Sequence, residues 1–265
     1  MSQHGCFQNA KAVSSLNAVA MHALRVLVRQ PSDHTLLAHP GLSGDQIHAR
    51  LLAVVTAADS AEFASMISAL TSRGVSHQII ANTHVPQLAR TLGQAWADGT
   101  MSFAQVSIGC ARLQGYLRQK GLNWCDDAEM RAAPKGSVFL AVPDFEQHTL
   151  GATLLAGQLR ANGFSVTLAF HAPVEQIVKM AITGQHNAFM ISSSCSETLA
   201  LLGATVQRLK HAQPATPVIL GGNALEQGSD FLLRTGADHK AQCWQDVVSI
   251  LMPASVNENT DPCGR

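Results

Sequence analysis

The sequence has no excess of charge of either sign, and this excludes several classes of function. Its 18 Lys and Arg residues balance its 18 Asp and Glu residues, so the formal net charge is zero. A protein that binds nucleic acid needs clustered positive charge, and an anionic membrane surface attracts the same kind of patch. We therefore expect no direct nucleic-acid partner and no membrane partner.

Long apolar runs and a targeting signal are also lacking. No stretch reaches the roughly 20 apolar residues that a membrane-spanning helix needs. Residues Met1–Gln8 are polar and do not show the basic and then apolar order of a secretory signal. These features predict a cytoplasmic protein.

The six cysteines form no paired motif. No two of them are spaced as Cys-x-x-Cys, and their positions are irregular: Cys6, Cys110, Cys125, Cys195, Cys243 and Cys263. This spacing predicts neither a zinc site nor a disulfide framework.

What the chain does contain is enough apolar sequence to bury a core, arranged in two different patterns. Hydrophobic residues make up 46% of the chain. Asp126–Gly136 is polar, contains Pro and Gly, and is interpreted as a linker. Before it, apolar residues recur at helical spacing, and after it short apolar runs alternate with helical patterns. The sequence therefore predicts an all-helical part followed by an α/β part.

The first part is predicted to be a short N-terminal segment and a helical bundle. Residues 1–40 hold one expected helix, Ala10–Gln30, and residues 41–130 form a helical-bundle cap. The expected cap helices are Ser43–Ala57, Ser60–Arg73, Pro86–Ala97 and Ser102–Lys120. Ser60 is predicted to be an N-cap, and Pro86 the first helical residue of its helix.

The second part, residues 135–253, is predicted to be a doubly wound α/β domain of the Rossmann or flavodoxin kind. Five apolar runs are expected to be strands: Ser137–Val142, Ser165–Phe170, Ala188–Ser192, Pro217–Leu220 and Ala237–Lys240. Because helical patterns separate these runs, we expect a five-stranded parallel sheet with helices on both faces. Residues 254–265 are polar and are expected to be a disordered tail.

Three loops of this domain carry candidate site residues. Ligands of such sheets bind beyond the carboxyl ends of the strands. The loops after the first, third and fourth strands supply a histidine beside a carboxylate, a pair of hydroxyls and a pair of glycines. The candidates are Glu146, His148, Thr149, Gly151, Ser192, Ser193, Gly221 and Gly222. All of them should meet at one edge of the sheet.

These loops resemble the pattern of the cobalamin-binding domain family. That pattern is Asp-x-His-x-x-Gly, then a turn containing Ser, then Gly-Gly, and here Glu146 stands at the place of the Asp. The resemblance implies that His148 replaces the cofactor's dimethylbenzimidazole base as the lower cobalt ligand. It also implies that the glycines leave room for the displaced nucleotide tail, and that Ser193 hydrogen-bonds to it.

The chemistry of the first loop suits this role. A neutral imidazole is a good ligand for transition metals. His148 precedes an expected helix, whose positive end disfavours the protonated ring. Glu146 can accept the proton of the other ring nitrogen and so fix the tautomer, although it is one methylene longer than Asp.

The expected bundle resembles the helical cap of cobalamin proteins. Leu92, Gly93, Trp96 and Gly99 match a Leu-Gly-x-x-Trp-x-x-Gly stretch of that cap. The resemblance implies that Trp96 lies over the upper face of the corrin.

One feature of related caps is missing. Many adenosylcobalamin photoreceptors place a Glu-His pair ten and eleven residues after this Trp, where the present chain has Val106 and Ser107. We expect Val106 to contact the cofactor and the upper axial position to be open to water or hydroxide. His4, in the polar start, is a candidate upper axial ligand.

Taken together, residues Gly74–Leu251 resemble the AerR/PpaA family of photosynthesis antirepressors. The chain holds no isomerase barrel, and the residues before the cap show no helix-turn-helix. The resemblance implies a cobalamin-dependent light or redox sensor without enzymatic activity, acting on a repressor of the PpsR/CrtJ type. Two alternatives stay open, namely a corrinoid methyl carrier for a methyltransferase system and a haem sensor that uses the same histidine.

Overall fold

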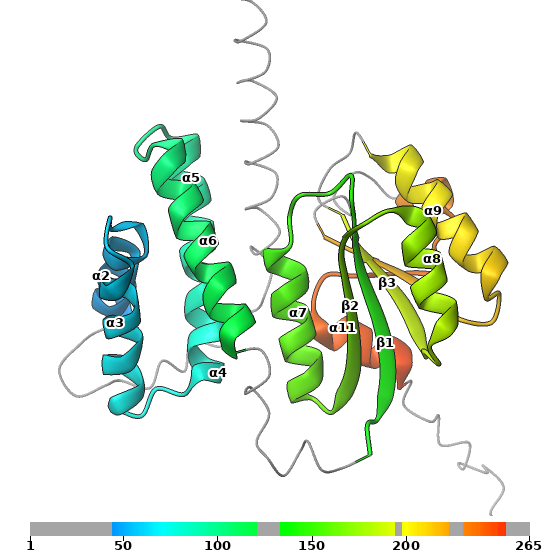
Figure 1. The fold of residues 1–265 in the computed structure, drawn as a ribbon, viewed down its shortest axis with the longest axis horizontal. Coiled ribbons are helices and arrows are strands. Elements are labelled where there is room, and N and C mark those ends of the chain that lie inside the picture. The colour runs from blue at the N-terminus through cyan, green and yellow to red at the C-terminus, as the bar shows by residue number, and fades with distance from the viewer. Residues whose placement is uncertain (1–43, 121–132, 194–197, 223–229, 253–265) are drawn as a thin grey trace, which may run out of the picture.

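The computed structural model describes residues 44–120, 133–193, 198–222 and 230–252. These residues form a helical bundle and an α/β domain that lie side by side (Figure 1). The predicted helix Ala10–Gln30, the candidate ligand His4 and the predicted tail 254–265 lie outside the described residues. Within the described ranges, no helix is long and apolar enough to cross a membrane.

The bundle is built around an apolar core. Its elements are α2 (Gly44–Thr56), α3 (Ser60–Ser72), α4 (His77–Ile79), the π-helical turn η2 (Ile80–His84), α5 (Val85–Ala97) and α6 (Phe103–Lys120). Leu51, Leu88, Leu92, Leu113 and Leu117 are almost completely buried in this core. The helical spacing of these leucines in the sequence is what places them on the inner faces.

Two expectations for the bundle were wrong in detail. Ser60 is the first residue of α3 rather than its N-cap, because the Asp59 carboxylate caps the helix by accepting the Ala61 N–H at 2.8 Å. The helix expected to begin at Pro86 instead begins at His77, behind the N-cap Ser76. Polar residues between His77 and His84 had hidden the apolar face of this stretch.

Proline at position 86 explains the π-helical turn in this long helix. Pro86 has no N–H to donate to the carbonyl of Asn82, four residues earlier, and its ring crowds that carbonyl. The N–H of Val85 bonds instead to the carbonyl of Ile80, five residues earlier. The helix therefore widens for one turn and continues as α5.

The α/β domain confirms the predicted fold class. Its strands are β1 (Gly136–Pro143), β2 (Phe164–Ala172), β3 (Ala188–Ser192), β4 (Val218–Gly221) and β5 (His239–Ala241). They form one parallel sheet in the order β2-β1-β3-β4-β5. This is the flavodoxin-like order, whose switch point lies between β1 and β3.

Helices cover both faces of the sheet. They are α7 (Leu150–Ala161), α8 (Val174–Thr183), α9 (Leu199–Ala212), α10 (Phe231–Thr235) and α11 (Trp244–Leu251). Alternate residues of β1 point to opposite faces, so that Leu140 packs in the core with α7 and α11, and Phe139 in the core with α8 and α9. Near-continuous burial along β1 follows from this double cover.

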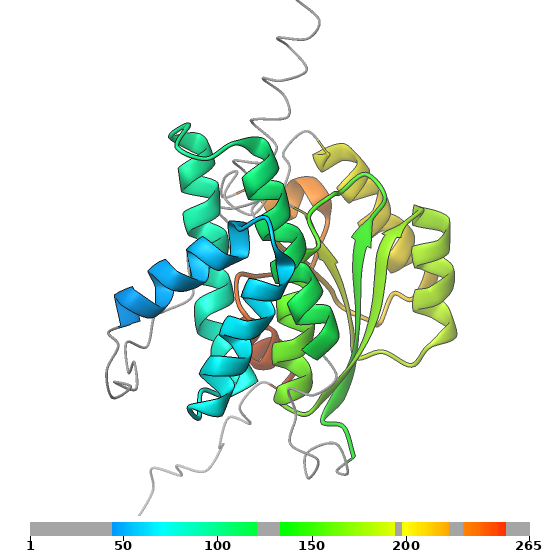
Figure 2. The same cartoon turned by 60° about the vertical axis from the view of Figure 1, so that its left-hand side comes forward.

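Helix α7 joins the two parts of the molecule. Leu150 and Leu154 belong to the core of the bundle, whereas Ala156 and Leu159 belong to the core of the sheet. In both views α7 lies between the cap helices and the strands (Figures 1 and 2). The cap is thus packed along the side of the α/β domain, and the α5–α6 turn lies at the end of the molecule where the strands have their carboxyl ends.

Candidate functional site

The loops after β1, β3 and β4 meet at the carboxyl edge of the sheet, as predicted. Ser192 at the end of β3 pairs with Gly221 at the end of β4. The next residue, Ser193, donates its backbone N–H to the Gly221 carbonyl at 2.9 Å. The loop after β1, which neighbours β3, carries Glu146 and His148. The switch point therefore has the histidine on one side and the glycine pair on the other.

His148 is held by the carboxylate of Glu146. Oε1 of Glu146 lies 2.5 Å from Nδ1 of His148 and also accepts the His148 backbone N–H at 3.0 Å. The Glu146 side chain is 1% exposed, whereas that of His148 is 25% exposed. Because an ionised carboxylate only accepts hydrogen bonds, Nδ1 is the donor. In the neutral ring this leaves the lone pair on Nε2, the nitrogen that can bind a metal.

The backbone around this pair is fixed from both sides. Thr149, which is 7% exposed, accepts a hydrogen bond from Nε2 of Gln114 on α6 at 3.3 Å. His171, at the end of β2, contacts the backbone carbonyl of Glu146 through Nδ1 at 3.2 Å. His171 adopts a φ of 50°, a left-handed conformation that is unusual for a residue other than glycine. The loop is therefore tied to the cap and to the edge strand.

The glycines of the site serve two different purposes. Gly222 has a φ of +100°, and a Cβ there would lie 2.2 Å from the Ser193 carbonyl oxygen. Only glycine can occupy this position, because the two loops touch through their backbones. A Cβ on Gly151, by contrast, would meet no atom of another described residue within 4 Å beyond its own stretch of α7. Gly151 is therefore not required by packing, and a side chain there would project into open space.

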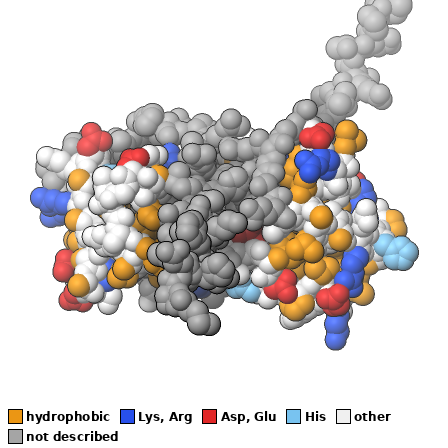
Figure 3. Space-filling model, turned by 90° about the horizontal axis from the view of Figure 1, so that it is seen from above, with side chains coloured by type: hydrophobic (Ala, Val, Ile, Leu, Met, Phe, Trp, Pro, Cys, Tyr) orange, Lys and Arg blue, Asp and Glu red, His pale blue; other side chains and the backbone are white. Residues whose placement is uncertain are grey.

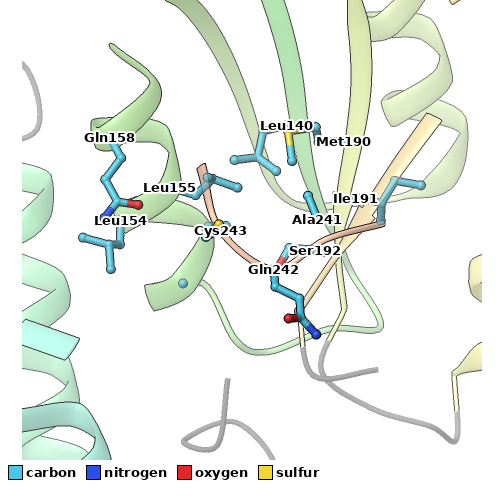
Figure 4. A pocket seen from close by; sticks show the side chains of 14 residues that line it. Leu140, Leu154, Leu155, Gln158, Met190, Ile191, Ser192, Ala241, Gln242 and Cys243 are labelled. Carbon is cyan, nitrogen blue, oxygen red and sulfur yellow. The ribbon is translucent and has the colours of Figure 1, made fainter. Parts of the chain in front are cut away.

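That space is a groove between α7 and the carboxyl ends of four strands (Figure 4). Gly151, Ser192, Gly221 and Gly222 line it, as do Leu140, Ala152, Leu154, Leu155, Gln158, Met190, Ile191, Ala241, Gln242 and Cys243. Most of these side chains are small or apolar, and polar groups are few. A groove of this kind suits an elongated, partly aromatic ligand segment that packs against backbone and aliphatic side chains.

Several groove residues were not predicted from the sequence. Gln158 lies on α7, two turns after Gly151, and Gln242 and Cys243 follow β5. Helical spacing from Gly151 could have indicated Gln158, since residues seven apart share a face. Burial raises the pKa of the Cys243 thiol, which therefore stays protonated at the groove wall. Residues after β5 carried no motif, and only the strand order places them here.

Ser193 and Val106 are among the predicted residues that do not line the groove. Ser193 is 1% exposed, and its hydroxyl lies 3.4 Å from that of Thr198. Ser192, rather than Ser193, lines the groove among the described residues. Val106 is 5% exposed and belongs to the core of the bundle. The structure therefore does not bring Val106 to the sheet edge.

A different set of α6 side chains lies on the helical face that includes the contact with the His148 loop. Phe103, Ser107 and Gln114 lie on one helical face, and Gln114 is the residue that contacts Thr149. Phe103 is 62% exposed, and its ring centroid lies 6.1 Å from that of Trp96, which is half-buried. Phe103 precedes Gln114 by eleven residues, or about 16 Å of helix. Measured along the axis of α6, the Trp96–Phe103 pair therefore lies about three turns beyond Gln114, the residue that contacts the His148 loop.

The described residues fit a corrinoid. An imidazole held by a carboxylate stands on the loop before α7, and a groove walled by Gly151, Gly221 and Gly222 lies beside that helix. A Cβ on Gly151 would point into that groove without meeting the described residues outside its own stretch of α7 within 4 Å.

The comparisons with known proteins agree with this arrangement. Residues 136–247 match the family model of the B12 binding domain. The fold and the site thus define a B12 binding domain that is preceded by a helical cap. The solved structure of the Methanosarcina barkeri monomethylamine corrinoid protein has the same fold, with a TM-score of 0.64 and 14% identity. That likeness covers 78% of this chain and 98% of the corrinoid protein and concerns the fold alone.

A relative with higher identity extends the match into the cap. The chain is 32% identical over 161 residues to the uncharacterized 20.5 kDa protein in the bchF-crtJ intergenic region of Rhodobacter capsulatus. The match covers 60% of this chain and 83% of the Rhodobacter protein. The chain belongs to the family of that protein, and its carboxy-terminal part is a B12 binding domain.

Proposed function

We propose that this protein is a cobalamin-dependent light or redox sensor that acts as an antirepressor of photosynthesis genes. In this proposal the protein has no enzymatic activity of its own and works through a repressor of the PpsR/CrtJ type. The observation that carries the first step is the His148–Glu146 pair, on the loop that leads into α7 and so to Gly151 in the wall of the groove.

Each part of the site has a role in holding the cofactor. His148 would offer its Nε2 to a bound cobalt, and Glu146 holds the ring through its Nδ1 proton. The groove past Gly151 and Gly222 takes the displaced nucleotide tail. Trp96 would lie over the opposite face of a bound corrinoid, which would supply visible absorption and an exchangeable ligand. His4, which lies outside the described residues, is a candidate for that upper position.

The output is proposed to leave through a protein surface rather than through DNA. The formal net charge is zero, and on the face in Figure 3 the described Lys and Arg side chains are scattered among acidic and apolar ones. Arg112, one of the basic residues of the cap, donates to the carbonyls of Val54, Val55 and Ala57 at the end of α2. A cap that shifts relative to the sheet would give a partner protein two states to distinguish.

The genomic position of the relative supports the choice of partner. The Rhodobacter capsulatus protein is described as lying between bchF and crtJ, and CrtJ names the type of repressor that the resemblance implies. The genes of a repressor and of the protein that opposes it are expected to be neighbours. A methyl carrier would use the same fold, and no contact of the described residues favours it over a sensor.

An absorption spectrum of the purified protein tests the cofactor and the signal together. We expect the chain to take up hydroxocobalamin, to show the spectrum of a base-off form with a histidine ligand, and to change that spectrum on illumination or reduction. Haem should not be retained at the same stoichiometry. A tight haem complex with no cobalamin uptake, or a cobalamin complex that changes neither in light nor on reduction, would contradict the proposal.

A further inference from the structure

The groove and the cap are joined by a polar contact between two side chains. Gln158 lines the groove, is 3% exposed and donates from Nε2 to Oδ1 of Asn82 at 3.2 Å. Gln158 belongs to α7, whereas Asn82 belongs to η2, so the contact crosses from the B12 binding domain to the cap. In Figure 4, Gln158 lies beside Leu154 on the flank of α7 that is nearest to the cap.

Asn82 lies at a weak point of the long helix. Pro86 cannot donate a hydrogen bond to the Asn82 carbonyl, and the π-turn replaces the regular ladder there. In the same turn, His84 is 4% exposed, and its Nδ1 has no hydrogen-bond partner among the described residues. A buried polar atom without a partner costs stability. The turn η2 therefore combines a broken ladder with an uncompensated polar atom.

A change in the conformation of η2 would also move the far end of the helix. The same helix continues as α5 and carries Trp96 near its end. A π-turn holds one residue more than an α-turn and so offsets α5 by about 100° from an uninterrupted helix, which means that a change in the width of this turn rotates α5. Even a partial change would displace Trp96 relative to His148, because α7 keeps the sheet side fixed.

We infer that Gln158 and Asn82 form the contact through which occupancy of the groove controls the stability of η2. A nucleotide tail in the groove packs against the Gln158 side chain, restrains its amide and strengthens the bond to Asn82. The tail below the corrin and the Trp96 above it are then linked through one helix. This inference rests on the proposed function, because it takes a corrinoid tail as the occupant.

Hydrogen exchange of the full chain tests the inference with two corrinoids. Cobalamin carries the nucleotide tail, and cobinamide lacks it. We expect cobalamin to slow exchange at amides of residues 80–85 by about two- to tenfold more than cobinamide does, the factor that one hydrogen bond of ordinary net strength supplies. Both corrinoids should protect the loop around His148.

Three variants make the result specific. Gln158→Leu and Asn82→Ala should each remove the extra protection by cobalamin and, without any corrinoid, should speed exchange in η2. Gln176→Leu is the matched control for the substitution, since Gln176 is exposed on α8 and lines neither the groove nor the contact between α7 and the cap. This control should keep the difference between the corrinoids. If Gln158→Leu fails to fold, Asn82→Ala carries the test from the cap side.

The outcomes separate this inference from the proposed function. A wild type that binds neither corrinoid contradicts the proposed function and this inference with it. Binding of both corrinoids with equal protection of η2 overturns the inference alone. Unchanged exchange of η2 in the corrinoid-free Gln158→Leu and Asn82→Ala variants also overturns it, whatever the cofactor.

Discussion

Glu146 binds His148 twice, through the ring Nδ1 at 2.5 Å and through the backbone N–H at 3.0 Å. One buried carboxylate thus fixes both the tautomer of the ring and the turn that presents it. The longer side chain of Glu, compared with the Asp of the family pattern, reaches its partner because it curls back onto its own loop.

The first prediction follows from this double contact. His148→Ala should abolish cobalamin binding or leave a base-on spectrum, because it removes the imidazole that Glu146 orients. Glu146→Gln should weaken binding by about 10- to 100-fold, the usual effect of losing an outer-sphere partner. Absorbance titration with hydroxocobalamin measures both. Glu175→Gln, on the surface, is the control, and affinity in Glu146→Gln equal to that of the control would contradict the role of the pair.

The two kinds of glycine predict opposite defects. Gly151→Leu should leave the unfolding free energy almost unchanged or raise it, since a helical glycine is replaced and the Cβ meets none of the described residues outside its own stretch of α7 within 4 Å. Cobalamin affinity should nevertheless fall by at least about tenfold because the groove is filled. Chemical denaturation and cobalamin titration on the same sample separate the two effects. Retention of full affinity would show that the ligand does not use this groove.

Gly222→Ala should instead damage the fold. The added Cβ would lie 2.2 Å from the Ser193 carbonyl oxygen at a φ of +100°. We expect a loss of about 1–3 kcal/mol in the free energy of unfolding without any ligand. Urea denaturation measures it, with Gly115→Ala in α6 as the control, where the new Cβ meets nothing within 4 Å. Equal stability of the two variants would refute the close backbone approach.

Trp96 is predicted to select the upper ligand. With Phe103 it forms an aromatic pair beyond the level of His148, and we expect the pair to exclude a bulky adenosyl group. In the dark, the wild type should prefer hydroxocobalamin over adenosylcobalamin by about tenfold or more, and Trp96→Ala should lose most of that preference. Ile108→Ala, on another face of α6, should keep it. Equal uptake of both cobalamins by the wild type would rule the idea out.

Two histidines inside the bundle predict a loss of stability in mild acid. Burial lowers the pKa of His84, and the neighbouring His48 lowers it further. For His48 burial also lowers the pKa, Asp45 opposes this and Arg90 adds to it. Because the unfolded chain then binds more protons, the unfolding free energy is at its full value above the ordinary pKa of 6.5 and falls as the pH drops below it.

Replacement of His84 checks this assignment. His84→Leu should flatten the dependence of urea midpoint on pH between 7.5 and 5, and it removes a buried Nδ1 that has no partner among the described residues. His211→Gln, at an exposed position of α9, should leave the dependence as it is. An unaltered slope in His84→Leu would assign the acid sensitivity to other groups.

Much of this molecule could be predicted from local sequence. The five strands lie within two residues of their predicted bounds, since buried parallel strands are short apolar runs between helical patterns. Glu146, His148 and the glycines were found because they follow strands directly. Gln242 also follows a strand but stands in no motif, and Gln158 and Asn82 lie on helices, so their roles depend on which strands and helices become neighbours. The start of the long helix was missed because its polar face and Pro86 interrupt the apolar repeat.

Helix α7 determines where the chain can be cut into smaller fragments. Every residue of α7 is buried or half-buried, because its two flanks belong to two different cores. A fragment that begins at Gly136 would expose Leu150 and Leu154 to water. We expect such a fragment to aggregate or to dimerise through that flank, whereas proteolytic cleavage between residues 120 and 133 should leave the two pieces associated. For expression, crystallisation or fusion to a reporter, the cap and the B12 binding domain should therefore be kept together as one unit.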